Sequence, residues 1–335
     1  MDMKKTGIFL VLICISLSLT IACTLKKAEV KKPVRIGLTV WGGTAHAYIA
    51  KEKGIFKKNN VEVELVLEKD DPAMLRSYKN GKLDGMLTVA PDVVILNSEG
   101  IPARIVYITD YSDSGDMIIG KPGLKSLSGL RGKTVSFQGI NTFSHMYVLS
   151  ALEKAGLKEY EVYFKNVEGS AVLNALEKGM IDAGHTWDPT LSQAIKKGYI
   201  VLSKAGDIPG VITDVLVFSD KLIRGRPDEV YGIVRSLLEA RDFIFTNRDE
   251  ALKIMAAAEG MSRDEITSGI NGVHMLDLAD NVKAMQESKE EKSLYNITKR
   301  MSEFYLKRGQ LTQIPDVKEI VDPAFIKRLN EERKK

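Results

Sequence analysis

Cysteine and tryptophan are scarce in this chain of 335 residues, which contains two of each. Two cysteines exclude a disulfide scaffold and a multi-cysteine zinc or iron–sulfur site. No large charge excess is present either: 48 basic and 44 acidic residues leave a net charge of +4, too small over this length to indicate nucleic-acid binding. Hydrophobic residues make up 44% and charged residues 27%, which excludes disordered, fibrous and multi-span membrane proteins. The length is typical of about two domains.

The N-terminus has a composition of its own. Lys4 and Lys5 precede an apolar stretch over residues 8–19, shorter than the ~20 residues that a membrane-spanning helix needs. The stretch leads to Ala22 and Cys23. A basic start, a short apolar core and a small residue before the cleavage point describe a secretory signal. The segment resembles a bacterial lipoprotein signal, and the alternative is an uncleaved signal anchor.

This resemblance implies a location. Residues 1–22 are expected to form the signal peptide, Cys23 to carry the lipid, including palmitate, and residues 23–32 to form an exposed tether. Cys14 would leave with the signal, so the mature chain would have no free thiol and no disulfide. The protein is then expected in the cell envelope, anchored on the outer face of the cytoplasmic membrane. This face is the periplasmic side in a two-membrane bacterium.

Strands and helices alternate along the next part of the chain. The expected strands cover residues 34–40, 61–67, 83–89 and 103–109, and helices cover 44–53 and 72–80, with a third beginning at Pro91. Short connections between such elements favour a parallel sheet covered by helices on both faces. The polar stretch 110–115 then interrupts the pattern as a loop.

A second series follows this loop. Its expected strands are 117–119, 133–137, 161–164, 181–184 and 199–202, and its helices are 142–155, 171–178 and 189–197. After an irregular stretch at 205–213 comes a strand at 215–218, and the remainder is mostly helical. Two such series predict an α/β protein with two lobes and a hinge, each lobe a mostly parallel sheet flanked by helices. Lobe 1 would comprise residues 33–112 plus 215–335, and lobe 2 residues 113–214.

Several residues at predicted strand ends could contact a ligand, because α/β folds bind ligands there. Trp41 precedes Gly42, and Trp187 lies two residues before Pro189. Such loop positions fit poorly with a role in core packing. His46, His145 and His185 also follow predicted strands, and a metal contact, a polar ligand contact and a structural role all stay open.

A predicted helix start offers another contact point. Asn141 or Thr142 could cap the helix, or its free N–H groups could bind an anion or another acceptor oxygen. No phosphate loop is present, since Leu127 stands where that motif requires glycine before Gly132-Lys133.

Carboxylates gather at the predicted loops and strand ends. Asp110, Asp113, Asp188 and Asp214 would crowd the space between the lobes. Salt bridges or hinge hydrogen bonds are one interpretation, and a cationic or amine ligand is the other. No arginine clamp for a sulfonate is evident.

Several segments together resemble a known family. They are Tyr48–Phe56, Gly81–Gly85, Leu124–Leu127, Leu130–Val135, Ser144-His145, Ala151–Leu157, Asp182-Ala183 and, most distinctively, Trp187-Asp188-Pro189. In this order they are similar to the periplasmic-binding-protein type 2 fold. They are more closely similar to the nitrate/sulfonate/taurine and thiamine-pyrimidine binding components of ABC importers.

The resemblance implies a ligand between the lobes. The residues that would hold it are Trp41, Gly42, Thr88, Asn141, Thr142, His145, Trp187, Asp188 and, at the hinge, Asp214. The enzymatic branch of the family has a cysteine-rich motif that this chain lacks, so no enzyme activity is expected.

The expected function is that of an extracytoplasmic, lipid-anchored solute-binding protein. It would deliver a small polar solute, similar to a sulfonate, nitrate, taurine or a pyrimidine, to an ABC permease by hinge closure. The alternative is a ligand sensor on the same fold that signals to a membrane partner. The expected partners are the solute, the permease subunits and, through Cys23, the bilayer. We expect a monomer without cofactor, metal or nucleic acid.

Overall fold

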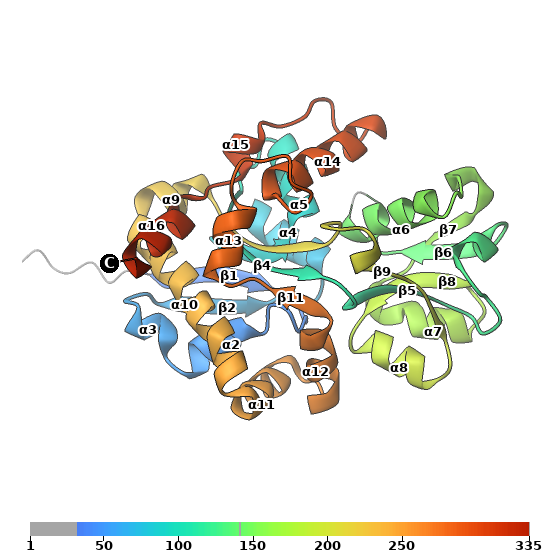
Figure 1. Cartoon of the computed structure of the whole chain (residues 1–335), viewed down its shortest axis with the longest axis horizontal. Helices are drawn as coiled ribbons and strands as arrows, with labels where there is room; N and C mark the ends of the chain where they lie inside the picture. The colour runs from blue at the N-terminus through green and yellow to red at the C-terminus, as the bar shows by residue number, and fades with distance from the viewer. Residues whose placement is uncertain (1–31, 141, 335) are drawn as a thin grey trace, which may run out of the picture. The chain divides into compact units, whose positions relative to one another are not determined.

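The computed structural model describes residues 32–140 and 142–334 (Figure 1). The predicted signal peptide, Cys23 and Asn141 lie outside the described residues, as does the predicted tether up to residue 31. From Val34 onward the chain forms one compact unit. None of the described helices combines the length and the apolar character that crossing a membrane requires.

The first sheet has the strand order β11-β4-β10-β3-β1-β2. Its strands are β1 (Val34–Leu38), β2 (Val63–Leu67), β3 (Gly85–Val89), β4 (Arg104–Ser112), β10 (Thr213–Phe218) and β11 (Val273–Met275). Strand β1 pairs in parallel with β2 and β3, whereas β10 is antiparallel to β3 and β4, and β11 is antiparallel to β4. The sheet is therefore mixed: β1 to β4 run one way, and β10 and β11 run the other.

The second sheet has the order β7-β6-β8-β5-β9. Its strands are β5 (Asp116–Gly120), β6 (Thr134–Phe137), β7 (Tyr163–Asn166), β8 (Ala183–Trp187) and β9 (Ile200–Lys204). Strand β6 is parallel to β7 and β8, and β5 is antiparallel to β8 and β9. In each sheet, a strand that follows a crossing between the sheets (β5 or β10) runs against its neighbours.

Helices flank both sheets (Figure 1). On the first sheet, α4 (Asp71–Lys79) and α5 (Ala90–Ser98) pack on β3. On the second, α6 (Phe143–Lys154), α7 (Val172–Glu177) and α8 (Thr190–Lys196) pack on β6, β8 and β5 respectively. The remaining α-helices are α2 (His46–Glu52), α3 (Ile55–Lys58), α9 (Asp220–Gly225), α10 (Pro227–Thr246), α11 (Arg248–Glu259), α12 (Arg263–Asn271), α13 (Leu278–Ala284), α14 (Leu294–Lys307), α15 (Val317–Ile320) and α16 (Ala324–Arg333). Four 3₁₀ turns are described, η1 (Leu127–Leu130), η2 (Glu159–Glu161), η3 (Gly169–Ala171) and η4 (Ala205–Asp207).

Helix α10 shows how sequence signals position the core. It begins at Pro227, where the missing N–H costs no helical hydrogen bond, and Asp228 and Glu229 fill its first turn. Its apolar residues recur at helical spacing and are buried at Val230 and Leu237, among others. The helix packs on α2, α3 and α11, so the prediction of this long helix is confirmed.

The chain crosses between the sheets twice, around residues 113–115 and 205–212. In the first crossing, the N–H groups of Asp113, Ser114 and Gly115 all point to the carbonyl oxygen of Gly272, at 2.8–2.9 Å. The second crossing lies alongside, since Gly206 N–H donates to Asp113 O at 2.7 Å. The backbone of both crossings is thus tied by hydrogen bonds to its surroundings.

One expectation about elements was wrong. Residues 110–112 belong to β4 and not to a loop, because Tyr111 and Ser112 pair with β10 and β11 in the sheet. The mostly helical C-terminal part also contains the short strand β11, which the sequence pattern did not indicate. Most strands of each sheet run in one direction, as expected, and only β5, β10 and β11 run against them. The predicted lobe boundaries and the hinge stay a prediction.

Candidate functional site

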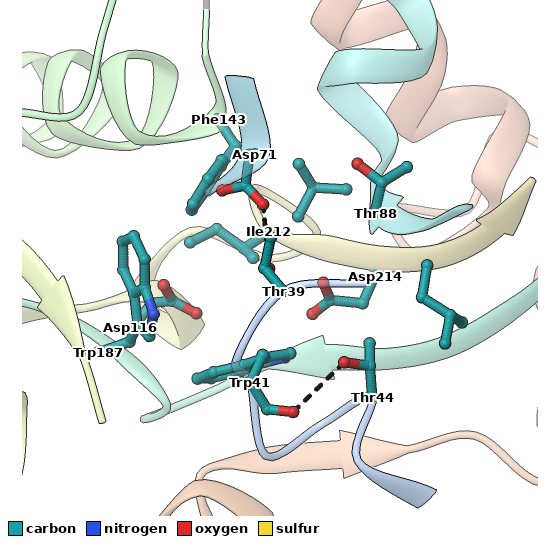
Figure 2. A pocket seen from close by; sticks show the side chains of 12 residues that line it. Thr39, Trp41, Thr44, Asp71, Thr88, Asp116, Phe143, Trp187, Ile212 and Asp214 are labelled. Atoms are coloured by element: carbon teal, nitrogen blue, oxygen red, sulfur yellow. Dashed lines mark hydrogen bonds between the residues drawn. The ribbon is translucent and has the colours of Figure 1, made fainter. Parts of the chain in front are cut away.

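A pocket lies between the two sheets and takes its lining from both (Figure 2). It holds about 430 Å³ of space free of protein atoms, part of it open to solvent. The lining residues are Thr39, Trp41, Thr44, Asp71, Leu87, Thr88, Val89, Asp116, Phe143, Trp187, Ile212 and Asp214.

The first sheet contributes the ends of its strands. Thr39 and Trp41 follow β1, and Thr88 is near the end of β3, which runs parallel to β1. The carboxyl ends of parallel strands meet at one edge of a sheet, so these side chains converge. Asp214 enters from β10, opposite Val89 in the register.

The second sheet contributes an aromatic wall. Trp187 ends β8, and its ring centroid lies 5.7 Å from that of Phe143 and 5.4 Å from that of His185. The His185 ring is also in contact with Tyr147, at 5.0 Å. Trp187 is partly exposed, whereas His185 is fully buried. The wall therefore has a packed inner part and an exposed face toward the pocket.

Glycines make room for both tryptophans. A Cβ atom at Gly169 would lie 2.5 Å from the Trp187 ring, and one at Gly115 would lie 2.6 Å from the Trp41 ring. Gly43 has the same role at the other end of Trp41, where a Cβ would lie 2.5 Å from Nε1. The indoles can hold these positions only because these three residues lack side chains.

Three carboxylates line the pocket. Thr39 Oγ1 donates a hydrogen bond to Asp71 Oδ1 at 3.1 Å (Figure 2), and burial raises the pKa of Asp71 to about 6. Asp116 Oδ1 lies 3.0 Å from His185 Nε2. Asp214, the third, is 4% exposed.

Asp214 is paired with a second buried carboxylate. The antiparallel register of β10 and β4 places Asp110 directly opposite Asp214. Thr109 Oγ1 donates to Asp110 Oδ2 at 3.1 Å, but Asp110 Oδ1 and Asp214 Oδ2 are buried without a hydrogen-bond partner. Burial raises the pKa of Asp110 to about 7, and burial together with the neighbouring Asp110 raises the pKa of Asp214 well above its usual range. The pair therefore retains a proton near neutral pH unless a positive group lies against it.

The structure brings together four of the predicted site residues: Trp41, Thr88, Trp187 and Asp214 all line this pocket. Thr88 Oγ1 also donates to Asp92 Oδ2 at 3.2 Å.

Four other predicted residues lie outside the lining: Gly42, Thr142, His145 and Asp188. Gly42 faces α12, where a Cβ would lie 3.3 Å from Gly269. Thr142 caps α6, its Oγ1 accepting from His145 N–H at 3.3 Å. Asp188 caps α8, its Oδ1 accepting from Ser192 N–H at 2.9 Å.

The histidines are dispersed. His46 is buried in α2 with Nδ1 3.0 Å from Gly43 O, and burial lowers its pKa to about 4. The His145 ring packs on Phe137 at 4.4 Å between centroids, and burial lowers its pKa to about 4 as well. His185 contacts Asp116 and, through Nδ1 at 2.8 Å, Ser144 Oγ. Among the described residues no group of three or more potential ligands could hold a metal ion.

Sequence reasoning missed much of the lining, namely Thr39, Thr44, Asp71, Leu87, Val89, Asp116, Phe143 and Ile212. A signal was available for some of them. Asp71 directly precedes the predicted helix 72–80, and Asp116 directly precedes the predicted strand 117–119. Ile212 gave no such signal, since it lies in a stretch without a regular pattern.

Two proteins that are similar to this chain in sequence have names that refer to binding. A Brucella abortus protein named as a binding protein is 27% identical over 250 residues, covering 73% of this chain and 76% of its own. A Bacillus subtilis protein with the provisional name of an aliphatic sulfonates-binding protein is 23% identical over 316 residues, covering 90% of this chain and 89% of its own.

The fold has solved counterparts. The periplasmic aliphatic sulphonate binding protein of Escherichia coli superimposes with a TM-score of 0.73 at 18% identity, covering 86% of this chain and 97% of that one. The chain therefore has the periplasmic binding protein fold. Residues 42–251 match the family described as NMT1/THI5 like. This match covers most strands of both sheets and every lining residue of the pocket except Thr39 and Trp41. By this match the chain belongs to the NMT1/THI5-like family.

Proposed function

We propose that this chain is the solute-binding component of an ABC importer, held at the outer face of the cytoplasmic membrane through a lipid on Cys23. The observation that carries the proposal is the pocket, whose lining comes from both sheets. The relatives named for binding, and for sulfonates in particular, support a small-molecule solute and a permease partner. As in those relatives, the role is binding and not catalysis.

Hinge closure is the mechanism that this arrangement supports. A solute that touches Trp41 and Asp214 on one side and Trp187 on the other interacts fully only when both sides are close together. Its greater affinity for that state would shift the population toward it. The crossings around residues 113–115 and 205–212 are the positions where the backbone would bend.

The test begins with a thermal-shift screen of the full chain in detergent against sulfonates, nitrate, pyrimidines and polyamines. A solute present at ~100 times its Kd stabilises the protein by about 2.7 kcal/mol, which is a readily measured shift in Tm. The hit is then followed as a labelled solute in proteoliposomes that contain the cognate permease and ATPase.

Solute accumulation that requires this protein supports the importer. Solute binding without any effect on transport would instead favour the sensor. Failure of every compound class to stabilise the protein would contradict the solute-binding role.

A further inference from the structure

The charged side chains among the described residues that line the pocket are all acidic. Asp71, Asp116 and Asp214 come from three different elements, α4, β5 and β10. No lysine, arginine or histidine is among the described residues that line the pocket. The nearest basic group to this set is the fully buried His185, which is in contact with Asp116.

The strongest demand for a positive group is at Asp214. Asp214 is only 4% exposed and lines the pocket. Its Oδ2 atom has no hydrogen-bond partner. Asp110 lies directly opposite in the ladder, so the two carboxyl groups can ionise together only when a positive group lies against them. Arg241 is close enough for its charge to lower the pKa of His46. Its guanidinium already donates hydrogen bonds to Met275 O and to the Asp242 carboxylate. The part of the chain that the structure describes thus provides no counter-charge at this position.

Aromatic rings form the other walls. Trp41, Trp187 and Phe143 line the same space, and Figure 2 shows Asp116 beside Trp187 and Asp214 close to Trp41. Indole faces attract cations, and a flat cationic group can stack on them while its edge donates to carboxylates. The buried indole N–H of Trp41 is directed to Asp214, so this ring helps to position the carboxyl group that faces the solute.

We propose that the solute is an organic cation: a flat or compact molecule with a protonated nitrogen group that donates to Asp214 and to the carboxylates facing it. This inference rests on the proposed solute-binding function and narrows it. An anionic sulfonate would meet three carboxyl groups and no basic side chain among the described lining residues, so it is disfavoured here, in contrast to the names of the relatives. The site thus combines a relative's fold with a different charge preference.

Three probes that share one ring and differ in charge test the proposal: benzamidinium, neutral benzamide and benzenesulfonate. Each is titrated into the full chain in detergent and followed by calorimetry and tryptophan fluorescence. Benzamidinium should bind at least ~10-fold more tightly than benzamide, since hydrogen bonds between charged groups are about twice as strong as neutral ones. Benzenesulfonate should bind the most weakly.

Two variants locate the effect. Asp214→Asn should weaken benzamidinium by ~10-fold or more and change benzamide by less than ~3-fold. Asp71→Asn, in α4, should also weaken the binding of benzamidinium. Because it changes a different element, it keeps the test valid if Asp214→Asn fails to fold. Asp249→Asn removes the same charge from a side chain that is 90% exposed, and should change neither affinity.

The outcomes separate the inference from the function on which it rests. Benzenesulfonate binding as tightly as benzamidinium would overturn the cation preference and leave a solute-binding protein. Equal affinities for the three probes, no binding by any of them, or equal effects of Asp214→Asn and Asp249→Asn would also overturn the preference. The function itself is judged separately, by the compound screen and the transport assay.

Discussion

Trp187 both packs against neighbouring rings and lines the pocket. Its ring packs on Phe143 and His185, yet it is partly exposed and lines the pocket. A residue that acts mainly through the solute differs in its mutational signature from one that acts through the core. Loss of a buried core aromatic costs ~3–5 kcal/mol of folding free energy, whereas loss of an aromatic anchor weakens binding.

Trp187→Ala should therefore weaken solute binding by ~1–3 kcal/mol, or roughly 5- to 150-fold, with a smaller change in folding stability. Calorimetry gives the affinity and a melting curve gives the stability. Trp187→Phe keeps a ring in place and should retain most of the affinity. A variant that unfolds, or one that binds as tightly as the wild type, would contradict the stacking role.

Asp92, a buried residue next to the pocket residue Thr88, makes the folding stability depend on pH. It is 2% exposed, accepts one hydrogen bond from Thr88, and burial raises its pKa to about 8, with the charge of Asp71 adding to the shift. The folded state therefore holds a proton that the unfolded state releases near pH ~4. Its stability contribution is complete below that pH and is lost as the pH rises toward 8.

Asp92→Asn, which cannot ionise, should make the unfolding free energy less dependent on pH. Relative to wild type, the variant should gain at least ~1 kcal/mol between pH 5 and pH 9, because each unit of pKa shift corresponds to 1.36 kcal/mol. Urea denaturation at the two pH values measures this gain. The same difference between variant and wild type at both pH values would show that Asp92 does not titrate in this way.

Among the helices and strands, those that depend on a local sequence pattern could be predicted, whereas those that depend on pairing with distant strands could not. Helix α10 could be predicted because Pro227 and the apolar spacing lie within the helix itself. Strand β4 could not be delimited, since Asp110, Tyr111 and Ser112 are polar or amphipathic and become strand only through partners in β10 and β11. The site followed the same division: the two tryptophans stood out by rarity, whereas Ile212 lies in a stretch without a regular pattern and is recognised only in the pocket lining.

A substitution at Gly272 tests how tightly the first crossing, residues 113–115, packs against this glycine. Its carbonyl receives three N–H groups of the first crossing, and a Cβ here would lie 2.6–3.0 Å from backbone atoms of Ser114 and Gly115. Backbone cannot move aside as a side chain can, so Gly272→Ala should cost ~1–3 kcal/mol of stability.

Gly225→Ala is the matched control. Gly225 lies in α9 with no atom near its absent Cβ, and the alanine should be neutral or stabilising by up to ~1 kcal/mol. Thermal unfolding measures both variants. Equal melting temperatures would contradict the tight packing of the crossing.

At the scale of the whole molecule, contacts beyond the pocket join elements of the two sheets. Arg308, just after α14, forms an ion pair with Glu159 of η2, and Gln193 Nε2 of α8 donates to Glu265 Oε1 of α12 at 3.3 Å. Helix α14 packs on α5 of the first sheet, whereas η2 leads into β7 of the second. If the two sheets separate when the solute leaves, these contacts stabilise the solute-bound arrangement.

Glu159→Gln should therefore weaken solute affinity without altering the pocket. The expected loss is ~0.2–1 kcal/mol, or up to about 5-fold, and it should shrink as salt is added. Glu177→Gln, which breaks an ion pair with Lys197 between helices of the second sheet, should leave affinity unchanged. Equal effects of the two variants would contradict a role of the Arg308–Glu159 contact in closure.

Intrinsic fluorescence of the full chain, titrated with the solute found by thermal shift, reports directly on whether the pocket is the binding site. The sequence contains two tryptophans, and both line the proposed pocket. We predict a saturable change in tryptophan emission, with the midpoint equal to the calorimetric Kd and reduced access of acrylamide to the rings. A solute that binds one to one by calorimetry and leaves both emission and quenching unchanged would show that it binds elsewhere, and would contradict the pocket as the site.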